Sequence, residues 1–133
     1  MIQRLWWEAR IRSLWEKRPI VWLSGVRRAG KTILCKNLEG IRYFDCELPS
    51  VRREMEDPEA FLKAIGSGTL ALDEIHRLAD PALLLKIAAD HFPELRIIAT
   101  GSSTLGASAK FKDTLAGRKL ELRLTPLCEN DTA

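Results

Sequence analysis

Four residues near the start of the chain have the types and the spacing that bind phosphate groups. Gly25, Gly30, Lys31 and Thr32 form the pattern G-x-x-x-x-G-K-T within LSGVRRAGKTIL. Backbone N–H groups can wrap around phosphate oxygens only where no Cβ atom intrudes, which explains the two glycines. The lysine would reach the β- and γ-phosphates, and the threonine hydroxyl would contact Mg²⁺. The pattern therefore predicts a nucleotide-binding loop.

The segments on either side of this motif are those that a phosphate-binding loop needs. An apolar run at residues 20–24 precedes the motif and a helical pattern follows it. A helix that begins at Lys31 would point the positive end of its dipole at the nucleotide. Arg27 and Arg28 fit two interpretations equally, solvated side chains or a grip on phosphate or on a partner. The predicted nucleotide-binding residues are Gly25, Val26, Arg27, Arg28, Ala29, Gly30, Lys31, Thr32 and Ile33.

Two adjacent carboxylates, Asp73 and Glu74, follow an apolar run at residues 69–72. In a parallel α/β sheet, ligands bind beyond the carboxyl ends of the strands, so these side chains would face the crevice of the phosphate loop. Neighbouring strand residues point to opposite faces, so the two acids need separate roles. We expect Asp73, with Thr32, to hold Mg²⁺, and Glu74 to polarise the attacking water. A helix cap or a solvated turn is the alternative.

Polar residues also end the next predicted strand, at Thr100 and Ser102. A hydroxyl group there could sense the γ-phosphate or orient the water, and it could cap the following helix at the same time. His76 and His91 have no partner at metal-ligand spacing, so we interpret both as surface or hydrogen-bonded histidines. The catalytic residues that these motifs predict are Lys31, Glu74, Thr100 and Ser102.

The elements that would position these residues alternate between β-rich and helical segments, as in a parallel sheet covered by helices. Three of the β-rich segments are continuous apolar runs, typical of strands covered on both faces, whereas residues 118–124 alternate and would have one wet face. We expect helices at residues 31–40 and after two Asp-Pro pairs, at 57–58 and 80–81, where the aspartate is a favourable cap. The predicted strands are residues 20–25, 41–47, 68–75, 95–102 and 118–124.

The composition indicates one globular, cytoplasmic domain. Of the 133 residues, 46% are hydrophobic and 29% are charged, with no long apolar run, which argues against a disordered or membrane protein. The N-terminus is too charged for a signal peptide. A net charge of +3 is too small to indicate nucleic-acid binding by itself. Three cysteines lack disulfide or zinc spacing and are interpreted as buried thiols, Cys35, Cys46 and Cys128.

All four tryptophans lie within the first 22 residues. On a helix, Trp7, Ile11, Leu14 and Trp15 form one apolar stripe, which predicts an amphipathic N-terminal helix packed on the sheet. Trp6 lies off the stripe, among arginines. We expect this helix to contact a second copy of the chain or a partner protein; nucleic acid is the weaker alternative, and no membrane contact is expected.

Four segments resemble the AAA-like ATP-binding proteins related to the archaeal ATPases. In order and spacing they are GVRRAGKT, LALDEIHR, IIATGSST and LAGRKLELRLTPL, and together they cover residues 18–127. The resemblance implies a three-layer P-loop NTPase fold whose five-stranded parallel sheet has the order 5-1-4-3-2. It also implies ATP and Mg²⁺ as ligands, with Asp73 at the metal and Glu74 at the water. Arg118, the arginine of LAGR, would approach a nucleotide in its own chain or in a neighbouring subunit.

Two features depart from the family pattern. Family members usually carry glutamine where this chain has His76, and they continue past the Pro-Leu strand, whereas this chain stops at CENDTA. We therefore expect a fragment, a truncated gene product or a minimal core. Within a single domain at 1–133, we assign an N-terminal helix at 1–18, the core at 19–127 and a tail at 128–133.

The leading hypothesis from the sequence is an ATPase that hydrolyses ATP with Mg²⁺. Catalysis would come mainly from positioning the reactants and from electrostatic stabilisation of the transferred phosphoryl group. One alternative is a nucleotide-binding switch or interaction module with little turnover, because the C-terminal region is missing. A small-molecule kinase is a third, and it would need an acceptor pocket and an arginine-rich lid that the sequence does not reveal.

Overall fold

The structure is a computed structural model that describes residues 2–25 and 28–124. Val26 and Arg27 of the predicted phosphate loop lie outside the described residues, as do Cys128 and the predicted tail. The central element is a five-stranded sheet in which every neighbouring pair is parallel. Its order is β2-β3-β4-β1-β5, which confirms the predicted order. The strands are β1 (Ile20–Gly25), β2 (Ile41–Asp45), β3 (Gly68–Asp73), β4 (Leu95–Ala99) and β5 (Lys119–Leu124).

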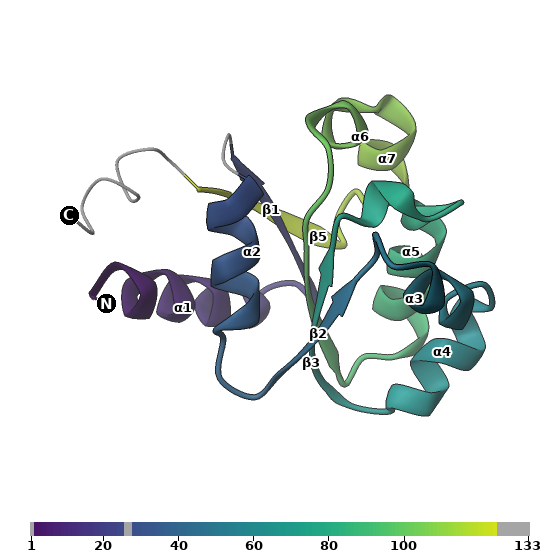
Figure 1. Cartoon of the computed structure of the whole chain (residues 1–133), viewed down its shortest axis with the longest axis horizontal. Helices are drawn as coiled ribbons and strands as arrows, with labels where there is room; N and C mark the ends of the chain where they lie inside the picture. The colour runs from purple at the N-terminus through teal and green to yellow at the C-terminus, as the bar shows by residue number, and fades with distance from the viewer. Residues whose placement is uncertain (1, 26–27, 125–133) are drawn as a thin grey trace.

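Helices cover both faces of the sheet, so the predicted three layers are present (Figure 1). Two helices, α1 (Ile2–Trp15) and α2 (Arg28–Lys36), pack on one face, and the others pack on the opposite face. Alternation along β1 explains the arrangement, because Ile20 and Trp22 enter one apolar core while Val21 and Leu23 enter the other. The helices of the second face are α3 (Pro49–Glu54), α4 (Pro58–Ile65), α5 (Pro81–His91), α6 (Ser103–Ala107) and α7 (Ala109–Thr114).

Several element ends differ from the sequence prediction for local reasons. The strand expected at 68–75 ends at Asp73, because Glu74 adopts a left-handed conformation and Ile75–Arg77 form a short 3-10 helix, η1. The strand expected at 95–102 ends at Ala99, because Ser102 is the N-cap of α6. The first helix after the loop begins before Lys31 and ends at Lys36, and α3 was not predicted.

The two Asp-Pro helix starts are confirmed. The side chain of Asp57 accepts a hydrogen bond from the backbone N–H of Ala60, and that of Asp80 accepts one from Leu83. Each cap satisfies a donor that the first turn of a helix otherwise leaves without a partner. These caps fix the starts of α4 and α5, which contact each other on the face that carries α6 and α7.

The predicted apolar stripe of α1 is buried against the sheet, and Trp6 is 57% exposed. Trp15 also anchors the helix with a buried hydrogen bond, since its indole N–H donates to the carbonyl oxygen of Ile97 in β4 at 2.9 Å. Cys35 and Cys46 are buried free thiols, as predicted. Within residues 2–25 and 28–124, no helix is long and apolar enough to span a membrane.

Replacing Trp15 with phenylalanine should lower the free energy of unfolding by about 1–3 kcal/mol, because a buried carbonyl loses its donor. Trp6→Phe is the matched control, since it makes the same side-chain change at an exposed position of the same helix. Urea unfolding followed by circular dichroism measures both. Equal losses in the two variants would contradict an anchoring role for the Trp15 hydrogen bond.

Candidate functional site

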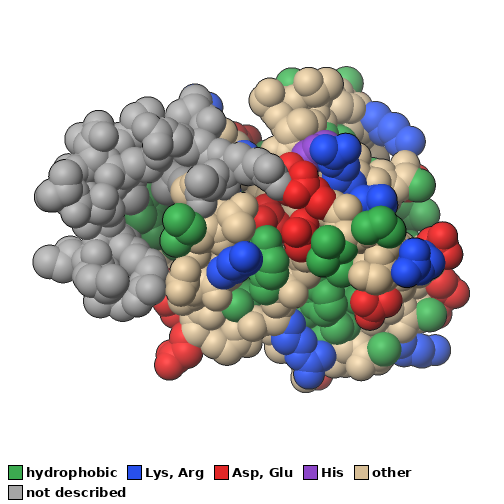
Figure 2. All heavy atoms as spheres, in the orientation of Figure 1, with side chains coloured by type: hydrophobic (Ala, Val, Ile, Leu, Met, Phe, Trp, Pro, Cys, Tyr) green, Lys and Arg blue, Asp and Glu red, His purple; other side chains and the backbone are tan. Residues whose placement is uncertain are grey.

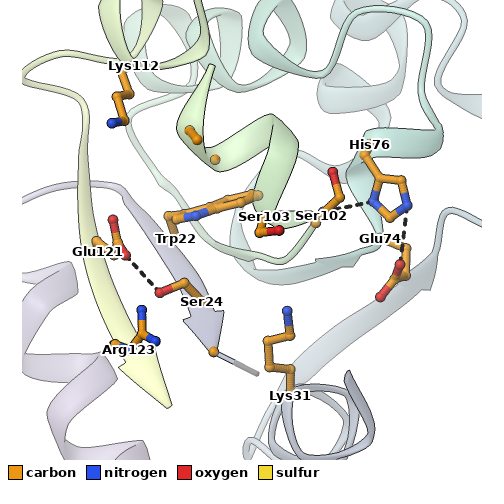
Figure 3. Close-up of a pocket in the computed structure, with 14 residues that line it drawn as sticks. Trp22, Ser24, Lys31, Glu74, His76, Ser102, Ser103, Lys112, Glu121 and Arg123 are labelled. Atoms are coloured by element: carbon orange, nitrogen blue, oxygen red, sulfur yellow. Dashed lines mark hydrogen bonds and ion pairs between the residues drawn. The ribbon is translucent and has the colours of Figure 1, made fainter. Parts of the chain in front are cut away.

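Parallel strands bring most of the predicted site residues to one edge of the sheet. The carboxyl ends of β1, β3 and β4 meet there, beside a cleft of about 680 Å³ that is also lined by α6 and β5. Gly25, Lys31, Glu74 and Ser102 all line this cleft (Figure 3). Figure 2 shows acidic side chains gathered on the surface, with histidine and basic side chains beside them. The edge is therefore hollow, polar and mixed in charge.

Asp73 is the centre of a hydrogen-bond cluster at this edge. Its side chain is buried, and one carboxylate oxygen accepts a hydrogen bond from the hydroxyl of Thr100. The other oxygen accepts from the hydroxyls of Thr32, at 2.8 Å, and Tyr43, at 2.5 Å. These donors come from α2, from β2 and from the residue after β4. A buried carboxylate needs such donors, because water cannot solvate it.

Tyr43 was not among the predicted site residues. Burial and its hydrogen bond to Asp73 raise the pKa of the Tyr43 hydroxyl far above its usual value, so it remains a donor. The register of β2 and β3 explains its place, and no sequence motif indicates it: Tyr43 is opposite Ala71, two residues before Asp73, and therefore lies on the same face as Asp73.

The described part of the predicted phosphate loop comprises Gly25, at the end of β1, and the first residues of α2. Gly25 ends β1 at a φ of 150°, a conformation that side chains rarely tolerate. Lys31 is 7% exposed and its side chain points into the cleft (Figure 3). Thr32 faces Asp73, whereas Ile33 is 59% exposed. Lys31 and Thr32 thus project from the first turns of α2 toward the carboxylate cluster.

Glu74 has a positive φ, which no other non-glycine residue among those described shares. Its φ and ψ are 61° and 47°, a left-handed conformation that costs a side-chain-bearing residue about 1 kcal/mol or more. Thr100 holds this turn: its hydroxyl accepts from the Glu74 N–H at 3.0 Å, and its carbonyl accepts from the Ile75 N–H at 2.8 Å. The turn brings the Glu74 side chain to the cleft.

His76 joins Glu74 to the loop after β4. The backbone N–H of Ser102 donates to Nδ1 of His76 at 3.0 Å, and Nε2 of His76 lies 3.5 Å from Oε1 of Glu74. The Ser102 hydroxyl itself caps α6 by accepting from the Leu105 N–H at 3.1 Å. Thr100 is fully buried and already bonded to Asp73 and Glu74. The two predicted sensor hydroxyls are therefore engaged within the protein.

Arg118 lies at the amino-terminal ends of the strands, opposite the edge that carries the other predicted site residues. Arg118 precedes Lys119, which pairs with Ile20 at the start of β1, whereas Gly25 ends β1 roughly 16 Å further along the strand at the usual rise per residue. The guanidinium donates two hydrogen bonds to Asp90, at 2.8 and 2.9 Å, and this contact lowers the pKa of that carboxyl. The structure does not bring Arg118 to the other predicted site residues.

The residues at the edge fit a magnesium ion that a nucleotide brings with it. Thr32 and Asp73 offer hard oxygen atoms in direct contact. Among the described residues, no group of three or more histidine, cysteine or acidic side chains could hold a metal by itself. Mg²⁺ usually binds through one or two protein oxygens, several waters and the phosphates of a substrate. The donor set matches that pattern.

Comparisons with known proteins identify the family and the fold of this chain. A family model described as AAA domain matches residues 17–132. The chain is 31% identical over 136 residues to uncharacterized protein Mb2031c of Mycobacterium bovis and to uncharacterized protein Rv2008c of Mycobacterium tuberculosis, covering 98% of this chain. It spans about 30% of the length of those relatives.

Solved structures show the same fold at low sequence identity. The Walker-type ATPase PABY2304 of Pyrococcus abyssi matches with a TM-score of 0.61 and 22% identity, covering 90% of this chain and 52% of that one. A DNA polymerase III gamma subunit-related protein of Thermotoga maritima matches with a TM-score of 0.56 and 11% identity, covering 92% and 45%. The chain belongs to the AAA domain family and has the fold of a P-loop ATPase core.

Proposed function

We propose that this chain binds ATP and hydrolyses it with Mg²⁺. The observation that carries the proposal is the convergence of Lys31, Thr32, Asp73 and Glu74 at one edge of the sheet, where α2 begins beside the cleft. A phosphate-binding loop supplies a cation and a helix start, while the two carboxylates supply a metal partner and a base. Membership of the AAA domain family supports ATP as the nucleotide.

Each residue then has a distinct task. The segment Gly25–Ile33, including Val26, Arg27, Arg28 and Ala29, would bind the phosphates, with Lys31 countering their charge. Thr32 and Asp73 would hold Mg²⁺, which neutralises charge on the β- and γ-phosphates when bound. Glu74 would accept the proton of the attacking water. Thr100 acts through its hydrogen bonds, because it fixes Asp73 and the turn at Glu74.

A substitution at Glu74 tests this proposal. Glu74→Gln should keep ATP affinity but lower turnover by at least about 100-fold, because the amide cannot accept the proton. Phosphate release and binding of a fluorescent ATP analogue measure the two effects. Lys31→Ala is the companion variant, and it should lose nucleotide binding as well.

One outcome would contradict hydrolysis, and another would contradict the role of Glu74. Tight binding without turnover in the unmodified chain would favour a nucleotide-binding switch. Turnover that is indifferent to Glu74→Gln would place the base elsewhere.

Removing the Asp73 charge should separate metal binding from nucleotide binding. In Asp73→Asn we expect Mg²⁺ to be required at concentrations at least about tenfold higher for half-maximal turnover, because the carboxylate no longer orients metal-bound water. Asp57→Asn is the charge-matched control, since asparagine is an equally good N-cap of α4. An unchanged Mg²⁺ requirement in Asp73→Asn would remove Asp73 from the metal site.

Arg118 fits a contribution to a neighbouring subunit better than one to its own, because it lies at the far edge of the sheet. If so, mixing inactive Lys31→Ala chains with inactive Arg118→Ala chains should restore part of the turnover, since each supplies what the other lacks. The mixture is assayed for phosphate release against each variant alone. Full activity of Arg118→Ala by itself would contradict any role in turnover.

A further inference from the structure

His76 contacts the candidate base on one side and the loop after β4 on the other. Its imidazole is about one-quarter exposed, and both ring nitrogens face protein groups (Figure 3). Nδ1 is 3.0 Å from the Ser102 backbone nitrogen, and Nε2 is 3.5 Å from Oε1 of Glu74. His76 thus lines the cleft while each of its ring nitrogens lies beside a protein group.

The partner of Nδ1 determines which nitrogen carries the proton. A backbone N–H can only donate, so Nδ1 must offer a lone pair, and a neutral imidazole then carries its proton on Nε2. Nε2 lies 3.5 Å from the Glu74 carboxylate, which can only accept a hydrogen bond. The backbone N–H of Ser102 thus fixes both the tautomer and the orientation of the ring, as the second partner of a functional histidine commonly does.

The loop after β4 controls Glu74 in two ways. Thr100 holds the backbone of Glu74 in its left-handed conformation through two hydrogen bonds to residues 74 and 75. Ser102 holds His76, which contacts the side chain of Glu74. Without His76, the side-chain torsions of Glu74 would lose one of their restraints, although the backbone would keep its own.

We propose that His76 is a positioning residue that holds the Glu74 carboxylate toward the cleft and ties it to the N-cap residue of α6. The proposal rests on the proposed function for its effect on turnover. It assigns no chemical step to His76, because both nitrogens are engaged by protein groups. A base that is held in its reactive orientation populates unproductive rotamers less often. Loss of His76 should therefore lower turnover rather than nucleotide affinity.

Three variants measure this effect. His76→Leu should lower kcat about tenfold or more while the KM for ATP changes little, in the range seen when the outer partner of a functional side chain is lost. His76→Gln should recover most of the activity, because its amide offers one acceptor and one donor. His91→Leu, at an exposed position late in α5, is the matched control and should leave kcat unchanged.

A double substitution separates positioning from general damage. If His76 acts through Glu74, His76→Leu should cause no further loss in a Glu74→Gln background. A loss of kcat that glutamine does not recover, or an equal loss in both backgrounds, would overturn the proposal. Urea unfolding of His76→Leu checks that the chain remains folded.

NMR spectroscopy tests the contact between His76 and Glu74 independently of turnover. Long-range ¹H–¹⁵N spectra should show His76 as the Nε2–H tautomer, and its Nε2 signal should shift in Glu74→Gln but not in Glu59→Gln, an exposed residue of α4. The Nδ1–H tautomer, or no shift in Glu74→Gln, would overturn the proposal. A chain with the expected spectrum but no turnover would instead overturn the proposed function.

Discussion

The buried carboxylate of Asp73 is the constraint on which the site depends. At 2% exposure it cannot be solvated by water, so its two oxygens require hydrogen-bond donors from the protein. The hydroxyls that meet this need belong to Thr32, Tyr43 and Thr100. They come from elements that are far apart in the sequence and adjacent only because β3 lies between β2 and β4, with α2 packed over them. The Asp73 carboxylate can therefore obtain its hydrogen-bond donors only if the strands have this order.

Thr100 extends this constraint to Glu74. Because the hydroxyl of Thr100 donates to Asp73 and accepts from the Glu74 N–H, the Asp73 carboxylate and the backbone of Glu74 share one hydrogen-bond partner. A left-handed residue directly after β3 would be costly without such a partner. The strained turn interrupts strand alternation, so two adjacent acids, which on a regular strand would point to opposite faces, both serve the same edge of the sheet.

Much of this arrangement could be predicted from the sequence, because strands buried on both faces appear as apolar runs and a phosphate loop has fixed spacing. The strand order came from the family resemblance, and the structure confirms it. Contacts that depend on register or on side-chain rotation could not be predicted. Tyr43 reaches Asp73 only through the pairing of β2 with β3, and His76 reaches Glu74 only after the turn at residue 74. The separation of Arg118 from Gly25 likewise follows from the pairing of β5 with β1.

Core packing determines how rigidly the loop after β4 can hold these residues. A Cβ atom on Gly101 would lie 2.8 Å from the Trp22 ring, and one on Gly106 would lie 3.1 Å from its indole nitrogen. The ring is 3% exposed and packs against Phe111 of α7 at a centroid distance of 4.9 Å. Thr100 and Ser102 flank Gly101, so neither can shift far without displacing a large aromatic side chain from a close-packed core. The orientation of Glu74 therefore depends on aromatic packing in β1 and α7 as well as on its own hydrogen bonds.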